Sequence, residues 1–281
     1  MMHRYLALPV ALWAAACGTA SSDRLPAPDN AGLRSPPVAA DSASVSSWPN
    51  AVGSVLAIAN TTTGEALLFR RDTTARPGRL GVVGYDAVAA VATVRDLRAT
   101  PCAARAVIRL ASAPEHWSLA LDSVQAHPVL VDALEDLAPA DSQRVVVRIQ
   151  RALNTLPDSG AATEFRGLPV VVRDAWIVRL QPTPVVVARA ARLRNLEATA
   201  HEELRFVVME GDQLRYVARV AGDEETVESW DLLAALMIQG RPWFAIAREG
   251  VKSLQLELVT RDSTAWRSVW RSDVLVCHGS K

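Results

Sequence analysis

Apolar residues alternate with polar ones over many short stretches of this chain. In the stretch 254–260, Leu254, Leu256 and Leu258 fall on one side of an extended backbone, with mostly polar residues between them. A strand buried on one face has this period of two. Similar runs bounded by turn residues predict strands at 52–59, 65–71, 89–94, 104–110, 116–121, 168–173, 175–180, 184–194, 204–210, 214–221, 243–248, 254–260 and 265–270. The stretch 226–238 fits a strand, although its second half also fits a helix.

One segment, 139–157, has the helical period instead. Its start is marked by Pro139, with Asp141 or Ser142 as the expected N-cap, and Pro157 is expected to end it. The apolar face consists of Val145, Ile149, Ala152, Leu153 and Leu156, and the opposite face carries Arg144, Arg148 and Arg151. We interpret these arginines as a solvated face paired with local carboxylates; a grip on an acidic partner is the alternative.

Together these elements predict an α+β fold, mostly an antiparallel β meander with one amphipathic helix near the middle of the chain. Half of the 281 residues are apolar, which is enough for a sizeable core. The predicted divisions are a leader at 1–16, a lipidated cysteine and flexible linker at 17–50, a β-rich subdomain at 51–138, the connecting helix at 139–157 and a C-terminal antiparallel meander at 158–281.

The first residues have the layout of an export signal. A short basic start is followed by the apolar run 5–16, which is too short for a membrane-spanning helix. The run ends in Ala14-Ala15-Ala16-Cys17, which resembles the lipobox of bacterial lipoproteins. This resemblance implies cleavage before Cys17 and lipidation of its thiol. Gly18 resembles the residue that lets such proteins continue to the outer membrane. An ordinary secretory signal is the alternative.

The residues after Cys17 lack any apolar period up to about position 50. Serine, proline, alanine and aspartate dominate there, a composition typical of a flexible tether. We therefore expect a globular body held to a membrane by a lipid anchor and a linker, in the cell envelope and more specifically at the outer membrane.

Two cysteines remain once Cys17 carries lipid. An even number of cysteines in an exported protein predicts a disulfide, here between Cys102 and Cys277. Two free buried thiols are the alternative.

The balance of charge bears on partners. Lysine plus arginine and aspartate plus glutamate number 30 each, so the chain has no net charge to attract nucleic acid. We predict no nucleic-acid partner; the expected partners are the membrane, through the anchor, and an envelope protein or polysaccharide.

No catalytic or metal-binding motif in the sequence meets its chemical requirements. His116 and His127 can be combined with nearby acids on paper, but no Gly-x-Ser-x-Gly nucleophile turn accompanies them. His201-Glu202-Glu203 is similar to the start of a zinc-protease motif, yet position 205 is arginine where the second histidine is required. Asp212 and the acids at 223–225 fit a solvated turn better than a calcium loop. We predict no catalytic residues, no metal and no cofactor.

Tryptophans are the most suggestive candidates for binding. Trp266 and Trp270 are an even number of residues apart and are therefore expected on one face of a strand, with Trp243 on a neighbouring strand. Exposed, such a row could stack sugar rings or dock a protein; buried, it belongs to the core. Burial in the core is the favoured interpretation, and an exposed binding surface is the alternative.

Most of the body also resembles a known group of proteins. The stretch from Phe165-Arg166-Gly167-Leu168-Pro169 to the closing Trp266, Trp270 and Cys277 resembles uncharacterised lipoproteins of GC-rich environmental bacteria. The resemblance implies an exported location and no particular chemistry. We therefore expect a non-catalytic binding or structural module of the envelope, with an exported hydrolase or a carrier of apolar ligands as alternatives.

Overall fold

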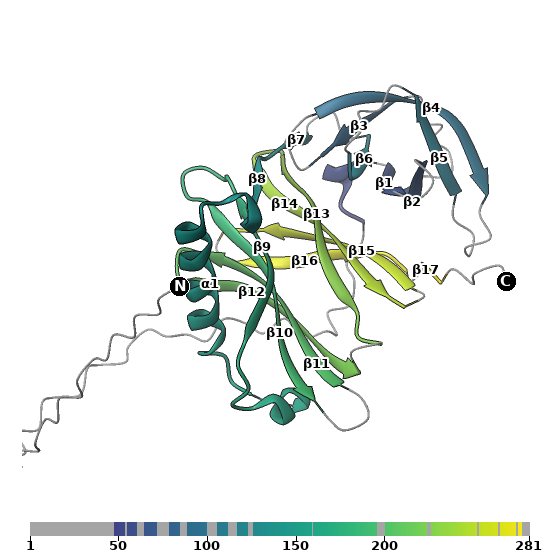
Figure 1. The fold of residues 1–281 in the computed structure, drawn as a ribbon. Coiled ribbons are helices and arrows are strands. Elements are labelled where there is room, and N and C mark those ends of the chain that lie inside the picture. The colour runs from purple at the N-terminus through teal and green to yellow at the C-terminus, as the bar shows by residue number, and fades with distance from the viewer. Residues whose placement is uncertain are drawn as a thin grey trace, which may run out of the picture. The chain divides into compact units, whose positions relative to one another are not determined.

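The computed structural model describes residues 48–53, 55–60, 65–71, 79–84, 89–99, 106–111, 117–122, 126–158, 160–195, 200–223, 226–251, 253–263, 265–273 and 275–276. Antiparallel strands dominate these residues, with one α-helix among them (Figure 1). This confirms the predicted α+β class with mostly antiparallel β structure. The predicted leader, most of the linker, and Cys17, Cys102 and Cys277 lie outside the described residues.

The first six strands close an antiparallel barrel in the order β1-β2-β5-β4-β3-β6. They are β1 (Val55–Asn60), β2 (Glu65–Arg71), β3 (Arg79–Val83), β4 (Ala89–Ala99), β5 (Ala106–Ala111) and β6 (Leu119–Leu121), preceded by the short helix η1 (Asn50–Val52). Six strands enclose a narrow interior, which alanine and branched aliphatic side chains fill. The buried side chains that pack together there are Ala57, Ala66, Leu68, Leu80, Val82, Ala92, Ile108 and Ala120.

An extended segment then connects the barrel to two further sheets. Its first part, β7 (Ala126–Pro128), pairs with β13, and its second part, β8 (Val131–Ala133), pairs with β9. Between them, the Val129 N–H donates to Ala235 O at 2.9 Å, and Leu130 O accepts from the Arg179 N–H at 2.9 Å. This continuous extended segment therefore leaves the sheet of β13 and joins the sheet of β9 between Val129 and Leu130.

The two sheets are consecutive meanders. The first sheet has the strand order β12-β11-β10-β9-β8, and we call it the β8–β12 sheet. The second has the order β16-β15-β14-β13-β7, with β17 also paired with β15. We name it after its two edge strands, the β7–β16 sheet, and it contains none of β8 to β12. Their strands are β9 (Val171–Val178), β10 (Val185–Asn195), β11 (Ala200–Glu210), β12 (Gln213–Asp223), β13 (Ser229–Ile238), β14 (Arg241–Gly250), β15 (Ser253–Arg261), β16 (Trp266–Arg271) and β17 (Leu275–Val276). The ambiguous stretch 226–238 is therefore a strand in its second half also.

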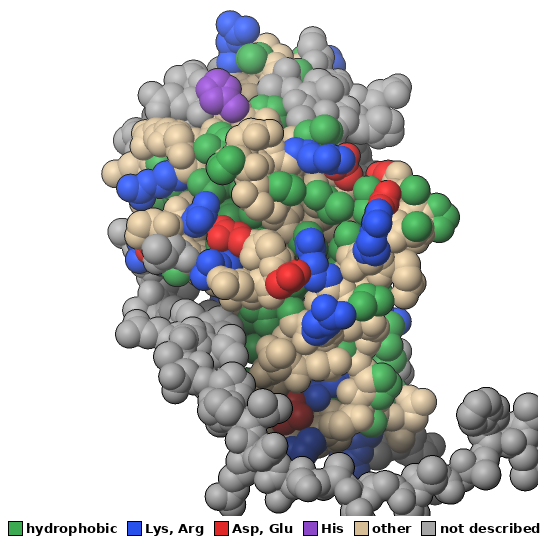
Figure 2. Space-filling model, turned by 90° about the vertical axis from the view of Figure 1, so that its left-hand side faces the viewer, with side chains coloured by type: hydrophobic (Ala, Val, Ile, Leu, Met, Phe, Trp, Pro, Cys, Tyr) green, Lys and Arg blue, Asp and Glu red, His purple; other side chains and the backbone are tan. Residues whose placement is uncertain are grey.

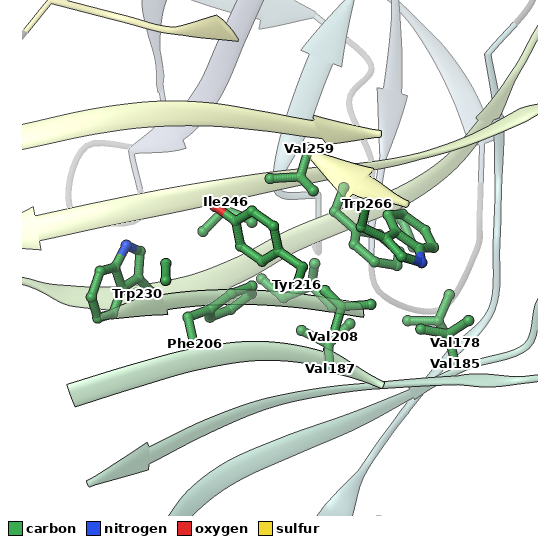
Figure 3. Close-up of a cluster of buried hydrophobic side chains, with 14 of the residues drawn as sticks. Val178, Val185, Val187, Phe206, Val208, Tyr216, Trp230, Ile246, Val259 and Trp266 are labelled. Atoms are coloured by element: carbon green, nitrogen blue, oxygen red, sulfur yellow. The ribbon is translucent and has the colours of Figure 1, made fainter. Parts of the chain in front are cut away.

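The inner faces of the two sheets pack against each other. Figure 3 shows Phe206 and Tyr216 of the β8–β12 sheet lying against Trp230, Ile246 and Trp266 of the other sheet. Phe244 stacks on Trp266 with ring centroids 4.4 Å apart and an interplanar angle of 8°. This aromatic core unites strands that lie far apart in the sequence.

Helix α1 (Pro139–Leu153) covers the outer face of the β8–β12 sheet, after the short helix η2 (Leu134–Asp136). Ile149, Ala152 and Leu153 are buried against it, as the periodicity predicts. The N-cap prediction is wrong. The cap residue is Ala138, because Pro139 occupies the first turn, where its missing N–H costs nothing. The Ser142 hydroxyl instead donates to Leu134 O at 3.0 Å.

The helix ends earlier than predicted. Its C-cap is Asn154 rather than a residue next to Pro157, and the short helix η3 (Gly160–Phe165) follows. Leu156 lies beyond the helix but is still buried in the same cluster. The apolar period therefore continues for one turn past the regular helix.

The outer face of the β7–β16 sheet packs against the barrel. Leu56, Leu119 and Leu121 of the barrel join Leu236 and Leu258 of the sheet in one buried cluster. The Ser118 hydroxyl hydrogen-bonds to Val83 O and also to Leu233 O. Among the described residues, no helix is long and apolar enough to cross a membrane.

Candidate functional site

Only one of the two histidines considered for catalysis, His127, lies within the described residues. His116 lies outside the described residues, and so does Ser123, the nearest hydroxyl before His127. His127 is exposed on β7, opposite Met237 of β13. The structure therefore brings together no Ser-His-acid arrangement among the residues that it describes around His127.

His201, Glu202 and Glu203 do not converge either, although they are consecutive on β11. His201 Nε2 lies 2.9 Å from Asp223 Oδ1, and Glu202 Oε1 lies 3.2 Å from Arg173 Nη2. Glu203 is fully buried among arginines. Over the described part of the chain, no group of three or more His, Cys, Asp or Glu side chains is arranged to hold a metal ion.

The structure decides between the two interpretations of the tryptophan row. Trp243, Trp266 and Trp270 are only 6%, 3% and 8% exposed, so they are core residues, as the favoured interpretation has it, and do not form a binding surface. Trp266 packs between the sheets, whereas Trp243 and Trp270 pack on the barrel side. The expectation that Trp266 and Trp270 share a face is wrong, because an extra residue in β16, between the partners of Leu258 and Val259, reverses the alternation.

The arginine face of α1 has local carboxylate partners. Arg144 pairs with Asp141, and Arg148 Nε lies 3.8 Å from Asp212 Oδ1, while Arg151 is exposed. In Figure 2, Lys and Arg side chains on this side of the molecule are interspersed with Asp, Glu and apolar side chains. This mixture fits a solvated helix face.

A different group of charged side chains lies beneath the end of α1. We call Asp158, Arg192, Glu203, Arg205 and Arg219 the arginine cluster. Arg192 and Glu203 are direct cross-strand partners on β10 and β11, and Arg205 and Arg219 are direct partners on β11 and β12. All four belong to the outer face of the β8–β12 sheet, because their neighbours Ala191 and Leu204 point into the inner core.

Glu203 is the centre of this cluster. Its Oε2 lies 2.6 Å from Arg192 Nε and 3.0 Å from Arg205 Nη2, and its Oε1 lies 3.0 Å from Arg219 Nε. Two arginines placed directly opposite each other repel. Glu203 offsets the repulsion between Arg205 and Arg219, since it pairs with both.

Asp158 supplies the second carboxylate from the chain segment after α1. Its Oδ1 lies 2.7 Å from Arg192 Nη2 and 3.6 Å from Arg205 Nη2. The hydrogen bond from Arg192 and the nearby positive charges lower the pKa of Asp158, against the opposing effect of burial. Asp158 is thus held as an anion.

The arginines also bind backbone carbonyls at the end of the helix. Arg205 Nη1 donates to Leu153 O at 3.2 Å, Arg219 Nη2 to Pro157 O at 3.4 Å, and Arg166 Nη2 to Asp158 O at 3.4 Å. Positive charge is favourable at a helix C-terminus, where carbonyls lack partners within the helix. The cluster therefore fastens the helix end to the sheet.

The cluster has more positive than negative charge. Three arginines face two carboxylates, which leaves one net positive charge before Arg166 is counted. Burial lowers the pKa of Arg205, although its guanidinium stays protonated at neutral pH. Arg205 Nε is buried and has no hydrogen-bond acceptor among the described residues. A guanidinium group with a free donor in a dry site is suited to binding an oxyanion.

A second buried ionic group lies between the two sheets and is balanced. Glu257 accepts a hydrogen bond from the Tyr216 hydroxyl at 3.1 Å and lies 3.3 Å from Arg271 Nη2. Arg248 lies 5.3 Å above the Trp230 ring and pairs with Glu228 at 2.7 Å. Burial raises the pKa of Tyr216 and keeps its phenol neutral. With equal numbers of opposite charges, this group is a structural network.

Comparison with known proteins adds no assignment to either group. No family model, curated protein or solved structure matches the chain. Sequence reasoning missed the arginine cluster because Arg192, Arg205 and Arg219 lie inside apolar runs that were interpreted only as strands. The available signal was charge in the interior of a strand, since arginine and glutamate are rarely buried without partners.

Proposed function

We propose that this chain is a lipid-anchored, non-catalytic binding or structural module of the bacterial cell envelope, related to the uncharacterised lipoproteins that it resembles. The proposed location in the cell envelope is supported by the export-type leader and by Ala14-Ala15-Ala16-Cys17. Several acyl chains on Cys17 would hold the protein firmly, because each buried methylene contributes about 0.8 kcal/mol. The anchor also fits the prediction of an outer-membrane location.

The structural support for this proposal comes from Trp48, the first described residue of the folded body. Trp48 packs edge-on against Trp270, with ring centroids 4.7 Å apart and an interplanar angle of 88°. Its Nε1 donates to Gly53 O at 2.6 Å. A folded body fixed at Trp48 and a lipid on Cys17 would be joined by residues 18–47, whose composition is that of a flexible linker. Such a linker has a root-mean-square reach of roughly 30 Å.

A binding role is favoured over the two alternatives for separate reasons. A hydrolase needs a base within reach of a nucleophile, and no nucleophile motif in the sequence accompanies the histidines. A carrier of apolar ligands needs an open cavity, whereas packed side chains fill the barrel interior.

The disulfide between Cys102 and Cys277 stays a prediction, and it would join the barrel region to the end of the last meander.

The anchor is tested by feeding cells an alkyne-bearing fatty acid and following the label and the membrane fraction. Wild-type protein should carry the label and sediment with membranes, and Cys17→Ser should lose both. Cys102→Ser is the matched control, because it removes another cysteine and should keep both properties. Unlabelled wild-type protein that retains residues 1–16 in the cytosol would refute the proposal.

The binding role is tested by crosslinking the lipidated protein in growing cells and identifying what is captured. A defined envelope protein or polysaccharide, captured by wild type and lost in Cys17→Ser, is the expected result. Turnover of a model ester, peptide or glycoside by the purified chain would favour the hydrolase instead.

A further inference from the structure

We propose that Arg192, Arg205 and Arg166 form a binding site for an oxyanion, a phosphate or carboxylate group, and that Asp158 occupies this site as an internal carboxylate which an incoming anion displaces. This site lies at the outer face of the β8–β12 sheet, beneath the end of α1, and binding there does not require the lipid anchor.

The two carboxylates of the arginine cluster differ in how firmly they are held. The Glu203 side chain has no exposed surface and lies within 3.0 Å of a nitrogen atom of each of three arginines. The Asp158 side chain is 19% exposed and lies within that distance of Arg192 only. Glu203 is therefore a permanent part of the site, while Asp158 is the carboxylate that solvent and ligands can reach.

The position of Asp158 in the chain also favours exchange. It lies between the end of α1 at Leu153 and the start of η3 at Gly160, outside regular secondary structure. Movement of this short connection would remove the carboxylate without disturbing a strand or breaking a hydrogen bond inside the helix. Arg192 and Arg205, by contrast, are fixed in the middle strands of the sheet.

Charge indicates what would replace Asp158. With Asp158 withdrawn, Arg192, Arg205 and Arg219 would share the single negative charge of Glu203. Partly buried guanidinium groups with a surplus of charge attract an oxyanion and bind it with short, charge-assisted hydrogen bonds. Arg205 Nε, which has no acceptor within the described ranges, provides one donor beyond those that Asp158 uses. Arg166 donates to the backbone oxygen of Asp158 and is exposed, so it can cover the bound oxyanion from the solvent side.

The test uses the full-length chain with Asp158→Ala, titrated with inorganic phosphate by calorimetry at constant ionic strength maintained with chloride. Asp158→Ala should bind one phosphate at least about tenfold more tightly than wild type does, and above the Kd its unfolding temperature should rise with the logarithm of the phosphate concentration. Adding Arg166→Ala to this variant should weaken binding about tenfold. Asp141→Ala is the matched control, because it removes a carboxylate from an exposed arginine pair, and it should behave as wild type.

Two further arms make the outcome decisive. Asp158→Asn keeps the shape of the side chain, and it decides the question if Asp158→Ala does not fold. Acetate and a short glutamate-rich peptide are titrated beside phosphate: competition with phosphate assigns the site to carboxylate groups as well, and binding of phosphate alone assigns it to phosphate groups. Phosphate binding to both Asp158 variants that is no tighter than to Asp141→Ala overturns the proposal.

Discussion

Arg192 and Glu203 face each other across β10 and β11, and their ion pair, 2.6 Å between Arg192 Nε and Glu203 Oε2, is buried beneath the end of α1. Few charged pairs are placed so deeply, because removing both ions from water costs several kcal/mol each. Here the cost is offset by a second and a third arginine on the same carboxylate. Glu203 thereby becomes the residue on which the packing of this face depends.

Replacing Glu203 with glutamine is expected to destabilise the protein by about 3–5 kcal/mol, because three buried or half-buried arginines lose their shared counter-charge. Urea unfolding followed by far-UV circular dichroism measures the change in the free energy of unfolding. Glu164→Gln is the matched control. Glu164 is exposed and pairs with Arg194, whose side chain is 46% exposed, so its loss should cost less than about 1 kcal/mol. Equal costs for the two variants would contradict this account of the cluster.

Asp158 gives the cluster a dependence on acid. Its pKa is lowered below the usual 3.8, chiefly by the hydrogen bond from Arg192. A carboxyl group with a lowered pKa in the folded state stabilises the fold above its unfolded-state pKa, and this contribution disappears as the pH falls through the folded value. Wild type should therefore be more stable than Asp158→Asn at neutral pH, and the difference should shrink below about pH 4. Urea titrations at a series of pH values measure it; a difference that stays constant down to the lowest pH would exclude an ionic role for Asp158.

The local elements could be predicted from the sequence better than their assembly could. The apolar period placed Ile149, Ala152 and Leu153 on the buried face of α1, and alternation located most strands. Closure of the barrel could not be predicted, because β1 pairs with β6 and β2 with β5 across long sequence separations. The change of sheet between Val129 and Leu130 could not be predicted either. It depends on backbone hydrogen bonds to Ala235 of β13 and to Arg179, next to the end of β9.

The arginine cluster could not be predicted from the sequence for a related reason. The sequence places Arg192 inside one apolar run and Glu203 directly before another, at 204–210, but only the register of β10 and β11 makes them partners. The shared face predicted for Trp266 and Trp270 is wrong by a single residue, because one extra position in β16 places the two rings on opposite faces. An error of one residue in register changes the side of every later side chain in a strand.

The core position of Trp266 leads to a stability prediction. Trp266→Ala removes a ring that stacks on Phe244 between the sheets, and its cost is expected to be about 3–5 kcal/mol. The Trp266 Nε1 hydrogen bond to Glu210 Oε1, 2.9 Å long, is lost as well. Val251→Ala, at a site that is 70% exposed, is the surface control and should change stability by less than about 0.5 kcal/mol. If Trp266→Ala unfolds at the same urea concentration as wild type, the ring is not a core residue.

The start of the body is stabilised by an aromatic contact that also predicts a local effect. Trp48→Ala removes the edge-on contact with Trp270 and the Nε1 hydrogen bond to Gly53 O, which together are expected to contribute about 1–3 kcal/mol. Because Trp48 precedes the first strand, its loss should release residues 48–53 before the barrel unfolds. Amide hydrogen exchange would then increase over η1 in Trp48→Ala while the protected amides of β10 and β11 exchange as in wild type. Trp48→Phe is the matched control, since it keeps a ring against Trp270 and should restore most of the protection. Uniformly faster exchange throughout the body would show instead that Trp48 stabilises the whole fold and not only residues 48–53.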